Sequence, residues 1–208
     1  MRRTFDITPP ITKSLAVWPG DTPPRREVVL DMARGDNITL STLHATVHLG
    51  AHADGANHFG KDAPGIDARP LEDYLGPCQV IRVWAPPKCR IRLEDLKAAI
   101  TEERVLLATR TYPDPNCFRE DFAALAPELV DQLHDRGVRL IGIDTPSVDV
   151  FDSRELEAHR RFLAHDMAIL EGLVLAEVPE GRYELIALPL RLVGFDASPV
   201  RAILRTLP

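Results

Sequence analysis

Apolar and polar positions alternate along the chain in a way that predicts strands and helices in turn. Residues 79–84 (Gln-Val-Ile-Arg-Val-Trp) alternate with a period of two, which is typical of a strand. Residues 138–143 are a short apolar run and are interpreted as another strand. Residues 121–136 have the spacing of a helix, with Asp121 as its start and Gly137 as its stop.

The remaining segments extend this alternation toward both ends of the chain. We expect further strands at 27–32, 38–48, 104–109, 168–178, 183–190 and 199–205, and further helices at 93–100 and 154–165. Residues 60–77 are rich in Gly, Pro and Asp, which predicts a loop with one helical turn at 71–75. Strands alternate with helices in the middle and dominate both ends, so the pattern favours an α/β fold with a mixed sheet.

The length of 208 residues suits a single domain, residues 1–208, and we find no internal repeat, low-complexity tract or linker. A chain of this length can bury a substantial core without disulfides or a structural metal. A bound metal would therefore serve chemistry rather than folding.

Charge and composition exclude several classes of partner. The formal net charge is −6 and basic residues are dispersed, which argues against nucleic-acid binding. No apolar run approaches the ~18 residues needed to span a membrane, and no apolar stretch follows the first residues as in a secretory signal. Cys78, Cys89 and Cys117 form no C-x-x-C pair, which indicates buried or free thiols in a reducing cytoplasm.

One short segment concentrates residues that bind metals. Three histidines and one aspartate occupy even positions within eleven residues: His48, His52, Asp54 and His58. An extended chain would put them on one face, but it would separate His48 from His52 by about 13 Å, too far for metal bonds of ~2 Å. The chain must therefore bend, and Gly50 and Gly55 supply the freedom. A helix would also bring i and i+4 together, but two glycines disfavour it.

Imidazole and carboxylate ligands suit zinc or manganese. Three protein ligands with an open position are typical of a catalytic zinc site, which can lower the pKa of bound water to about 7. His58 is either a further ligand or the group that transfers protons. The competing interpretations are a chance cluster of polar residues and a closed structural zinc site, although no cysteine lies near.

Other candidate residues allow two interpretations each. His44 lies within a predicted strand and is assigned to structure or to the surroundings of the site, and His134 ends a predicted helix. His159 and His165 lie on opposite sides of one predicted helix, so only one can face the site. Glu171 stands alone in an apolar strand, where a carboxylate is costly unless it is paired or bound to metal.

Four residues in loops are also ambiguous. Trp18 is either an ordinary packing residue or a stacking platform for an aromatic substrate. Phe59 lines the same pocket as His58 or packs in the core. Asp144 and Asp149 either support the site or cap loops, and loop capping is the interpretation that we favour.

The segment His48-Leu-Gly-Ala-His-Ala-Asp54, followed by His58, resembles the H-x-G-T-H-x-D-x-P-x-H signature of the metal-dependent cyclase family. The resemblance continues in order along nearly the whole chain, through residues 18–23, 142–149, 159, 169–173 and 187–191. The blocks at 18–23 and 142–149 are similar to those of the bacterial kynurenine formamidases within that family. The chain departs from the pattern where Ala51 replaces Thr, Gly55-Ala56 replaces Ala-Pro and Asn57 replaces an apolar residue.

The resemblance implies a swivelling β/β/α-type fold and two divalent metal ions per subunit, usually zinc, with manganese as an alternative. It implies that His48 and His52 bind one ion, that His159 binds the other, and that Asp54 and Glu171 bridge both. His58 would give and accept protons, and Trp18 would contact the substrate. The subunits would form a homodimer or a higher even oligomer.

The activity that the resemblance implies is arylformamidase activity, the hydrolysis of N-formyl-L-kynurenine to L-kynurenine and formate in tryptophan catabolism. The alternatives are a related hydrolase acting on another amide, on a lactam such as isatin or on an ester, and a non-catalytic metal-dependent binding protein. A serine hydrolase is disfavoured because the chain lacks the G-x-S-x-G motif.

Overall fold

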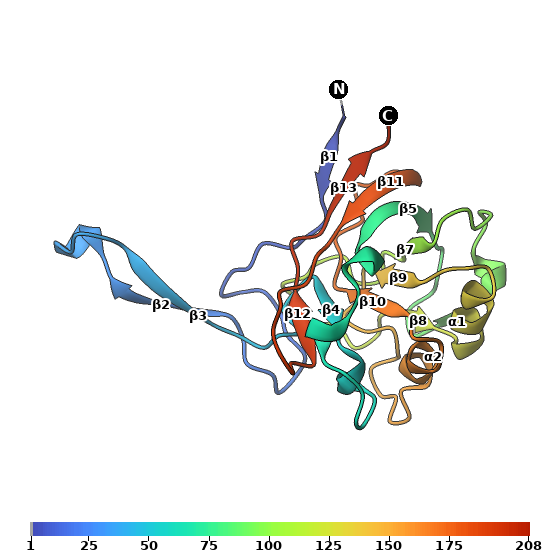
Figure 1. Ribbon diagram of the computed structural model, residues 1–208, viewed down its shortest axis with the longest axis horizontal. Coiled ribbons are helices and arrows are strands. Elements are labelled where there is room, and N and C mark those ends of the chain that lie inside the picture. Colours follow the sequence, from blue (N-terminus) through green and yellow to red (C-terminus); the bar gives the residue numbers. More distant parts are fainter. Residues whose placement is uncertain (1) are drawn as a thin grey trace.

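The computed structural model describes residues 2–208 and arranges them around one large mixed sheet (Figure 1). The strands of this sheet are, in spatial order, β1 (Thr4–Asp6), β13 (Ile203–Thr206), β11 (Gly181–Ile186), β5 (Leu75–Arg82), β7 (Arg104–Ala108), β9 (Leu140–Ile143), β10 (Ala168–Glu171), β4 (His52–Asp54) and β12 (Ala197–Pro199). Two small sheets pair β2 (Arg25–Leu30) with β3 (Leu40–His44), and β6 (Arg90–Ile91) with β8 (Ala124–Leu125). The predicted α/β fold with a mixed sheet is confirmed.

The centre of the sheet is parallel and buried on both faces. Strands β5, β7, β9 and β10 run parallel to one another. In β7, Val105 and Leu107 point toward the helices, while Leu106 and Ala108 point into a second core formed with the antiparallel strands. Strands that are covered on both faces contain few polar residues, so β7 and β9 appear in the sequence as mainly apolar runs.

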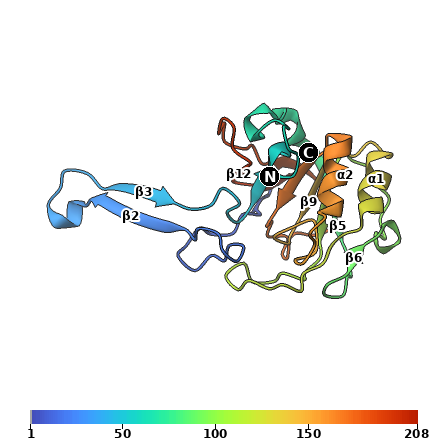
Figure 2. The same cartoon turned by 90° about the horizontal axis from the view of Figure 1, so that it is seen from below.

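Two helices, α1 (Pro127–His134) and α2 (Glu157–His165), lie side by side and cover one face of the sheet (Figure 2). The predicted helix start at Asp121 is wrong, because Ala124 and Leu125 pair with β6 and Pro127 takes the first helical position. The predicted stop is confirmed, since Gly137 adopts a left-handed φ of 85°. Among residues 2–208, no helix is both long and apolar enough to cross a membrane.

Short 3-10 helices occupy several connections: η1 (Met32–Arg34), η2 (Ala56–His58), η3 (Ile66–Ala68), η4 (Leu71–Asp73) and η5 (Leu93–Asp95). Helix η4 confirms the predicted turn at 71–75. The predicted helix at 93–100 is wrong beyond η5. The Gln79 side chain donates to Ala99 O and accepts from Thr101 N, and these bonds hold the non-helical chain after η5 against β5.

Several predicted strands are shorter than expected. The strand predicted at 168–178 ends at Glu171, because Gly172 turns the chain with a φ of 65°. The strand predicted at 38–48 ends at His44, and residues 45–48 bend toward the body of the protein. The strand predicted at 183–190 is β11, which ends at Ile186.

Strands β2 and β3 form a hairpin that projects far from the sheet (Figures 1 and 2). We call residues 25–44 the arm. None of the arm residues is buried, and its apolar side chains are exposed too: Val29 is 51% and Leu43 60% exposed. A two-stranded hairpin is at best marginally stable when it packs on nothing else.

Candidate metal centre

The centre forms where β4 pairs with β10. In this antiparallel pair Glu171 lies opposite His52, and directly paired residues project to the same side of a sheet. Their side chains meet, with 3.3 Å between His52 Nε2 and Glu171 Oε2. Asp54, two residues along β4, projects to the same side, and all three side chains are buried.

The bend predicted between His48 and His58 is present. Gly50 adopts a φ of 57°, and the chain reverses so that the His48 ring lies 5.0 Å from His52 and 4.2 Å from His58, measured between centroids. Helix η2 carries His58 back to the cluster. Gly55 serves differently from the prediction: its φ of −82° is ordinary, but a Cβ there would lie 2.7 Å from the Ile66 nitrogen.

His159 enters from the first turn of α2. Its Nδ1 donates to Asp149 Oδ2 at 2.8 Å, and the backbone nitrogen of His159 donates to the same carboxylate. Asp149 therefore supports the site by orienting the ring, and it caps the helix rather than the loop that we expected. The other ring nitrogen, Nε2, lies 3.5 Å from Asp54 Oδ2 and 3.6 Å from Glu171 Oε1. His165 points away and bonds Asp131.

Three of the imidazoles are oriented in the same manner. One nitrogen of each donates to an acceptor at the edge of the cluster: His48 Nε2 to Asp196 (3.0 Å), His52 Nδ1 to Gly50 O (2.8 Å) and His159 Nδ1 to Asp149 (2.8 Å). The second nitrogen of each ring faces Asp54 or Glu171. Histidines that bind metals usually donate their remaining N–H to such an acceptor, which fixes the tautomer.

Each of the two buried carboxylates, Asp54 and Glu171, has one oxygen near His52 and the other near His159. Asp54 Oδ1 lies 3.2 Å from His48 Nδ1 and 3.5 Å from His52 Nε2, whereas Asp54 Oδ2 lies near His159. Glu171 repeats this division, with Oε2 toward His52 and Oε1 toward His159. Oε1 also accepts from the backbone nitrogen of Val148 at 2.7 Å.

The donor set fits a divalent cation. Both Asp54 oxygens and His52 Nε2 are buried without a hydrogen-bond partner among the described residues. A buried carboxylate is costly unless it is paired with a cation or with hydrogen-bond donors. A metal ion between these atoms would satisfy all three, and their imidazole and carboxylate chemistry suits zinc or manganese.

The electrostatics of the unliganded cluster also indicate that it is built for positive charge. Burial lowers the pKa of His48, but the carboxylates of Asp54 and Asp196 outweigh burial and raise it to about 9. Burial opposes the protonation of His159 too, yet Asp149 and Asp54 raise its pKa to about 10. Without metal, protons on these two rings therefore balance the buried carboxylates.

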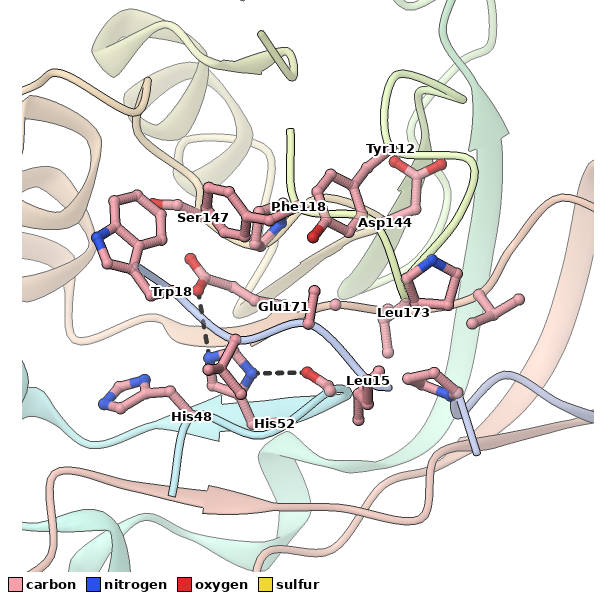
Figure 3. Close-up of a pocket in the computed structure, with 18 of the residues that line it drawn as sticks. Leu15, Trp18, His48, His52, Tyr112, Phe118, Asp144, Ser147, Glu171 and Leu173 are labelled. Atoms are coloured by element: carbon pink, nitrogen blue, oxygen red, sulfur yellow. Dashed lines mark hydrogen bonds and ion pairs between the residues drawn. The ribbon is translucent and has the colours of Figure 1, made fainter. Parts of the chain in front are cut away.

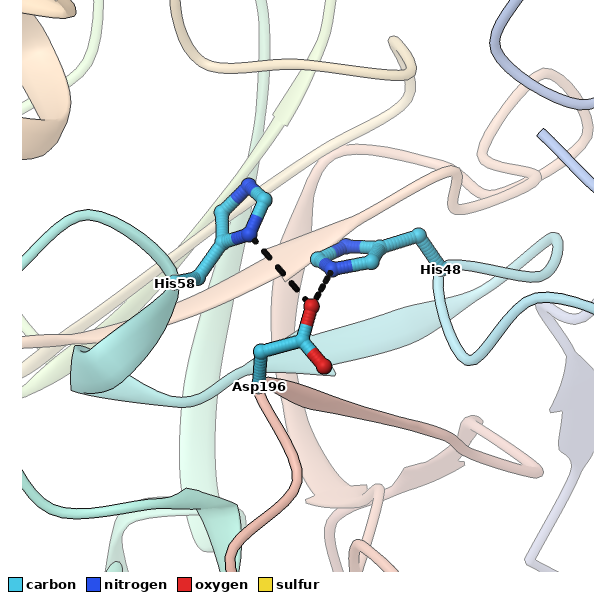
Figure 4. Close-up of side chains that lie close together, drawn as sticks. All are labelled: His48, His58 and Asp196. Carbon is cyan, nitrogen blue, oxygen red and sulfur yellow. Dashed lines mark hydrogen bonds and ion pairs between the residues drawn. The ribbon is translucent and has the colours of Figure 1, made fainter. Parts of the chain in front are cut away.

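His58 differs from the other three imidazoles. Its side chain is 36% exposed, and its Nδ1 lies 3.6 Å from Asp196 Oδ2, beyond hydrogen-bond distance (Figure 4). Burial lowers its pKa, and the neighbouring charges of His48 and His159 lower it further against the opposing effect of Asp54. The ring is thus neutral at neutral pH and is free to accept a proton.

Asp196 is the residue of this cluster that the sequence does not reveal. It precedes β12, whose pairing with β4 sets Ala197 opposite Asp54 and so brings Asp196 to His48 and His58. Its sequence neighbours carry no metal-binding spacing, so only the strand pairing identifies it. His44 lies in the arm, where it bonds Glu27, and does not approach the centre.

A cavity of about 720 Å³ opens beside the centre. His48, His52, His58, His159 and Glu171 line one part of it. Aromatic and apolar side chains line the rest, among them Leu15, Trp18, Tyr112, Phe118 and Leu173 (Figure 3).

The aromatic residues differ in their roles. The Trp18 ring packs against Phe151 and Phe118, with centroids 5.0 and 5.5 Å away, so it is a wall of the cavity rather than a free indole. Phe59 packs beside the His159 ring at 5.0 Å and belongs to the core.

Comparison with known proteins places this geometry in a family. The chain is 28% identical to a potential metal-dependent hydrolase with cyclase activity, with a TM-score of 0.87 and complete coverage of both chains. It is also 28% identical to a predicted metal-dependent hydrolase from Bacillus stearothermophilus, with a TM-score of 0.82 over 99% of this chain and 98% of the other.

Isatin hydrolase A from Labrenzia aggregata shares the fold at 23% identity, with a TM-score of 0.85 over 100% of this chain and 94% of the other. The model of the Cyclase family matches residues 5–150, which include the bent segment from His48 to His58. The chain therefore belongs to the Cyclase family and has the fold of its metal-dependent hydrolases.

Proposed function

We propose that this protein is an arylformamidase that hydrolyses N-formyl-L-kynurenine to L-kynurenine and formate, as a step of tryptophan catabolism. The observation that carries the proposal is the pair of buried carboxylates, Asp54 and Glu171, at the wall of an aromatic cavity. Each of them has an imidazole ring near both of its oxygen atoms. A chain of the Cyclase family with this donor set is suited to metal-dependent hydrolysis.

Two divalent ions, zinc or manganese, would be held by this set. His48 and His52 would hold one ion, His159 the other, and Asp54 and Glu171 both. When bound, the ions would supply a water nucleophile at neutral pH and polarise the amide carbonyl.

His58 is assigned the proton transfers. Its ring is neutral at neutral pH and lines the cavity, so it can take a proton from the attacking water. The same ring then gives that proton to the aryl nitrogen as the C–N bond breaks. This second transfer matters because an unprotonated arylamide anion is a poor leaving group near neutral pH.

The walls of the cavity fit an aromatic substrate. Trp18, Tyr112 and Phe118 line it together with aliphatic side chains. Aromatic pairs prefer offset or edge-to-face packing, which these rings can offer to an aryl group. Trp18 is held by Phe118 and Phe151, so it would meet the substrate without losing side-chain freedom.

The test is an assay of formate release from N-formyl-L-kynurenine by the purified protein, before chelation, after chelation and after zinc or manganese is added back. We expect activity that chelation abolishes and metal restores. Isatin is the comparison substrate, and because hydrolysis of this cyclic amide opens the ring without releasing formate, its turnover is followed by the loss of isatin itself. Faster turnover of isatin would replace the proposal with a lactam hydrolase, and metal binding without turnover of either compound would indicate a binding protein.

We also propose that the protein works as a homodimer or higher even oligomer in the cytoplasm, with the arm covered by a second copy. The arm carries Arg25, Arg26 and Arg34 against Glu27, Asp31 and Asp36, so its net charge is zero while the whole chain carries −6. Two copies can therefore meet through the arm without the repulsion that the rest of the chain would impose. The exposed side chains of Val29 and Leu43 would be buried by this contact.

A further inference from the structure

A cation at the cavity, Arg110, has no role in the proposed chemistry. Arg110 follows β7 and is the only arginine or lysine among the described residues that line the cavity. No carboxylate of residues 2–208 lies within 4 Å of its guanidinium group. Its contact is with the ring of Trp84, whose centroid lies 5.8 Å from the Arg110 Cζ atom. An indole carries no charge, so the cation of Arg110 is not neutralised.

The backbone at Arg110 is strained and held in place. Its φ is 61°, a left-handed conformation that costs a residue with a side chain about 1 kcal/mol or more. The Asp144 carboxylate, only 6% exposed, accepts from Arg110 N at 2.9 Å, from Thr109 N at 2.9 Å and from the Thr109 hydroxyl at 2.6 Å. Strain that the surrounding structure enforces often occurs where a side chain is aimed at a ligand.

We propose that Arg110 binds a carboxylate of the substrate and so makes the enzyme selective for aryl formamides that carry a carboxylate group. The inference rests on the proposed hydrolysis. A guanidinium group binds carboxylates through paired hydrogen bonds. The other charged groups of the cavity are acidic or belong to the imidazole cluster, so Arg110 is its one permanent cation among the described residues.

The position of Arg110 in the fold agrees with this role. The carboxyl ends of β7, β9 and β10 lie at one edge of the sheet, where Arg110 follows β7, Asp144 follows β9 and Glu171 ends β10. Ligands of sheets with parallel strands bind at this edge. A substrate with its amide at the metal centre and its ring against Trp18 would therefore have Arg110 within the same cavity.

The experiment compares N-formyl-L-kynurenine with its methyl ester, which has nearly the same shape but no carboxylate. Arg110→Gly and Arg110→Gln are measured beside Arg191→Gln, a matched loss of charge at an exposed arginine outside the cavity. We expect both Arg110 variants to raise KM for the acid about 10- to 100-fold, with kcat nearly unchanged and the ester unaffected. Arg191→Gln should behave as the unmodified protein does.

Glycine adopts the left-handed conformation freely, so Arg110→Gly is expected to remain folded. Binding of L-kynurenine, followed by calorimetry on metal-free and metal-loaded protein, gives a readout without turnover. Weakened binding only in the Arg110 variants supports the carboxylate site, even if neither substrate is hydrolysed and the proposed function fails. Equal losses for acid and ester, or unchanged kynurenine binding, would overturn the inference.

Discussion

At the residue scale, the four imidazoles of the centre fall into two groups, according to whether a hydrogen bond from one ring nitrogen holds the ring in place. His48, His52 and His159 each donate one N–H to a fixed acceptor, which leaves the other nitrogen directed at a buried carboxylate. His58 has no such bond, is partly exposed and has a lowered pKa. Rigid rings suit metal ligands, whereas a neutral ring at the cavity wall suits a proton carrier.

Replacing His58 tests this division. In the proposed mechanism the ring transfers protons and holds no metal, so His58→Ala should reduce kcat by about 10²–10⁴ while the metal content stays unchanged. Turnover and metal analysis on the same preparation give the answer. His165→Ala removes an imidazole that bonds Asp131 outside the centre and should leave turnover unchanged. Near-normal turnover in His58→Ala would refute the assigned role.

The raised pKa values of His48 and His159 predict how the metal-free protein responds to pH. Both values, about 9 and about 10, exceed the 6.5 of an ordinary histidine, so the folded state binds more protons than the unfolded state. This contribution is complete below pH 6.5 and is lost as pH rises through 9 and 10. Thermal unfolding of chelated protein should show Tm falling across that window.

The metal-loaded protein provides the control for this pH response. Bound ions take the place of the protons on both rings, so its Tm should be less sensitive over the same window, and metal binding should release protons. A chelated protein whose Tm is constant or rises from pH 6.5 to 10 would contradict the assignment.

At the element scale, the centre depends on the close approach of β10 to the turn before β4. Gly172 follows Glu171 with a φ of 65°, and a Cβ there would lie 2.2 Å from the carbonyl oxygen of Gly50. That same carbonyl accepts the hydrogen bond from His52 Nδ1. A side chain at 172 would therefore displace the turn that orients His52 against Glu171.

Gly172→Ala and Gly137→Ala form a matched pair. Both positions have left-handed φ, so each alanine costs about 1 kcal/mol of stability. A Cβ at Gly137 would meet no atom within 4 Å, whereas at Gly172 it would strike backbone and cost about 1–3 kcal/mol more. Denaturant unfolding should show this difference, and only Gly172→Ala should weaken metal binding. Equal losses of stability would show that the approach to Gly50 is not tight.

At the scale of the whole molecule, the arm is the part whose own contacts do not explain its stability. It packs on neither core, yet it leads through residues 45–47 directly to His48 in the cavity. A partner that covers the arm would therefore also restrict the segment that enters the centre. Oligomer formation and activity are expected to change together.

Leu43→Asp tests the arm. A charge at this exposed apolar position should favour dissociation to a species of 23.1 kDa in light scattering after size exclusion, because the carboxylate would be buried unpaired in the contact. Gln132→Glu adds the same charge on the exposed side of α1 and should leave the oligomer intact. A chain that is monomeric before mutation, or an unchanged oligomer in Leu43→Asp, would contradict the proposed contact.

Much of the fold follows from local pattern. The central strands could be predicted because burial on both faces leaves mainly apolar residues, as in β9 and in β7 after Arg104. The path of the chain after η5 could not, because Gln79, distant in sequence, holds Ala99 and Thr101 against β5. The predicted helix start at Asp121 was wrong because of another distant contact: residues 124–125 pair with β6, and this pairing outweighs the local helical periodicity.

The chemistry of the centre can be inferred from the sequence: imidazoles and a carboxylate are dense within residues 48–58, glycine stands at the bend, and Glu171 stands alone in an apolar strand. Which of these donors meet depends on the folded arrangement of the strands and helices. It selected His159 over His165, added Asp196 through the pairing of β12 with β4, and set Arg110 in the same cavity. A metal site requires atoms within a few ångströms of one another, and strand pairing rather than spacing along the chain sets such distances between remote residues.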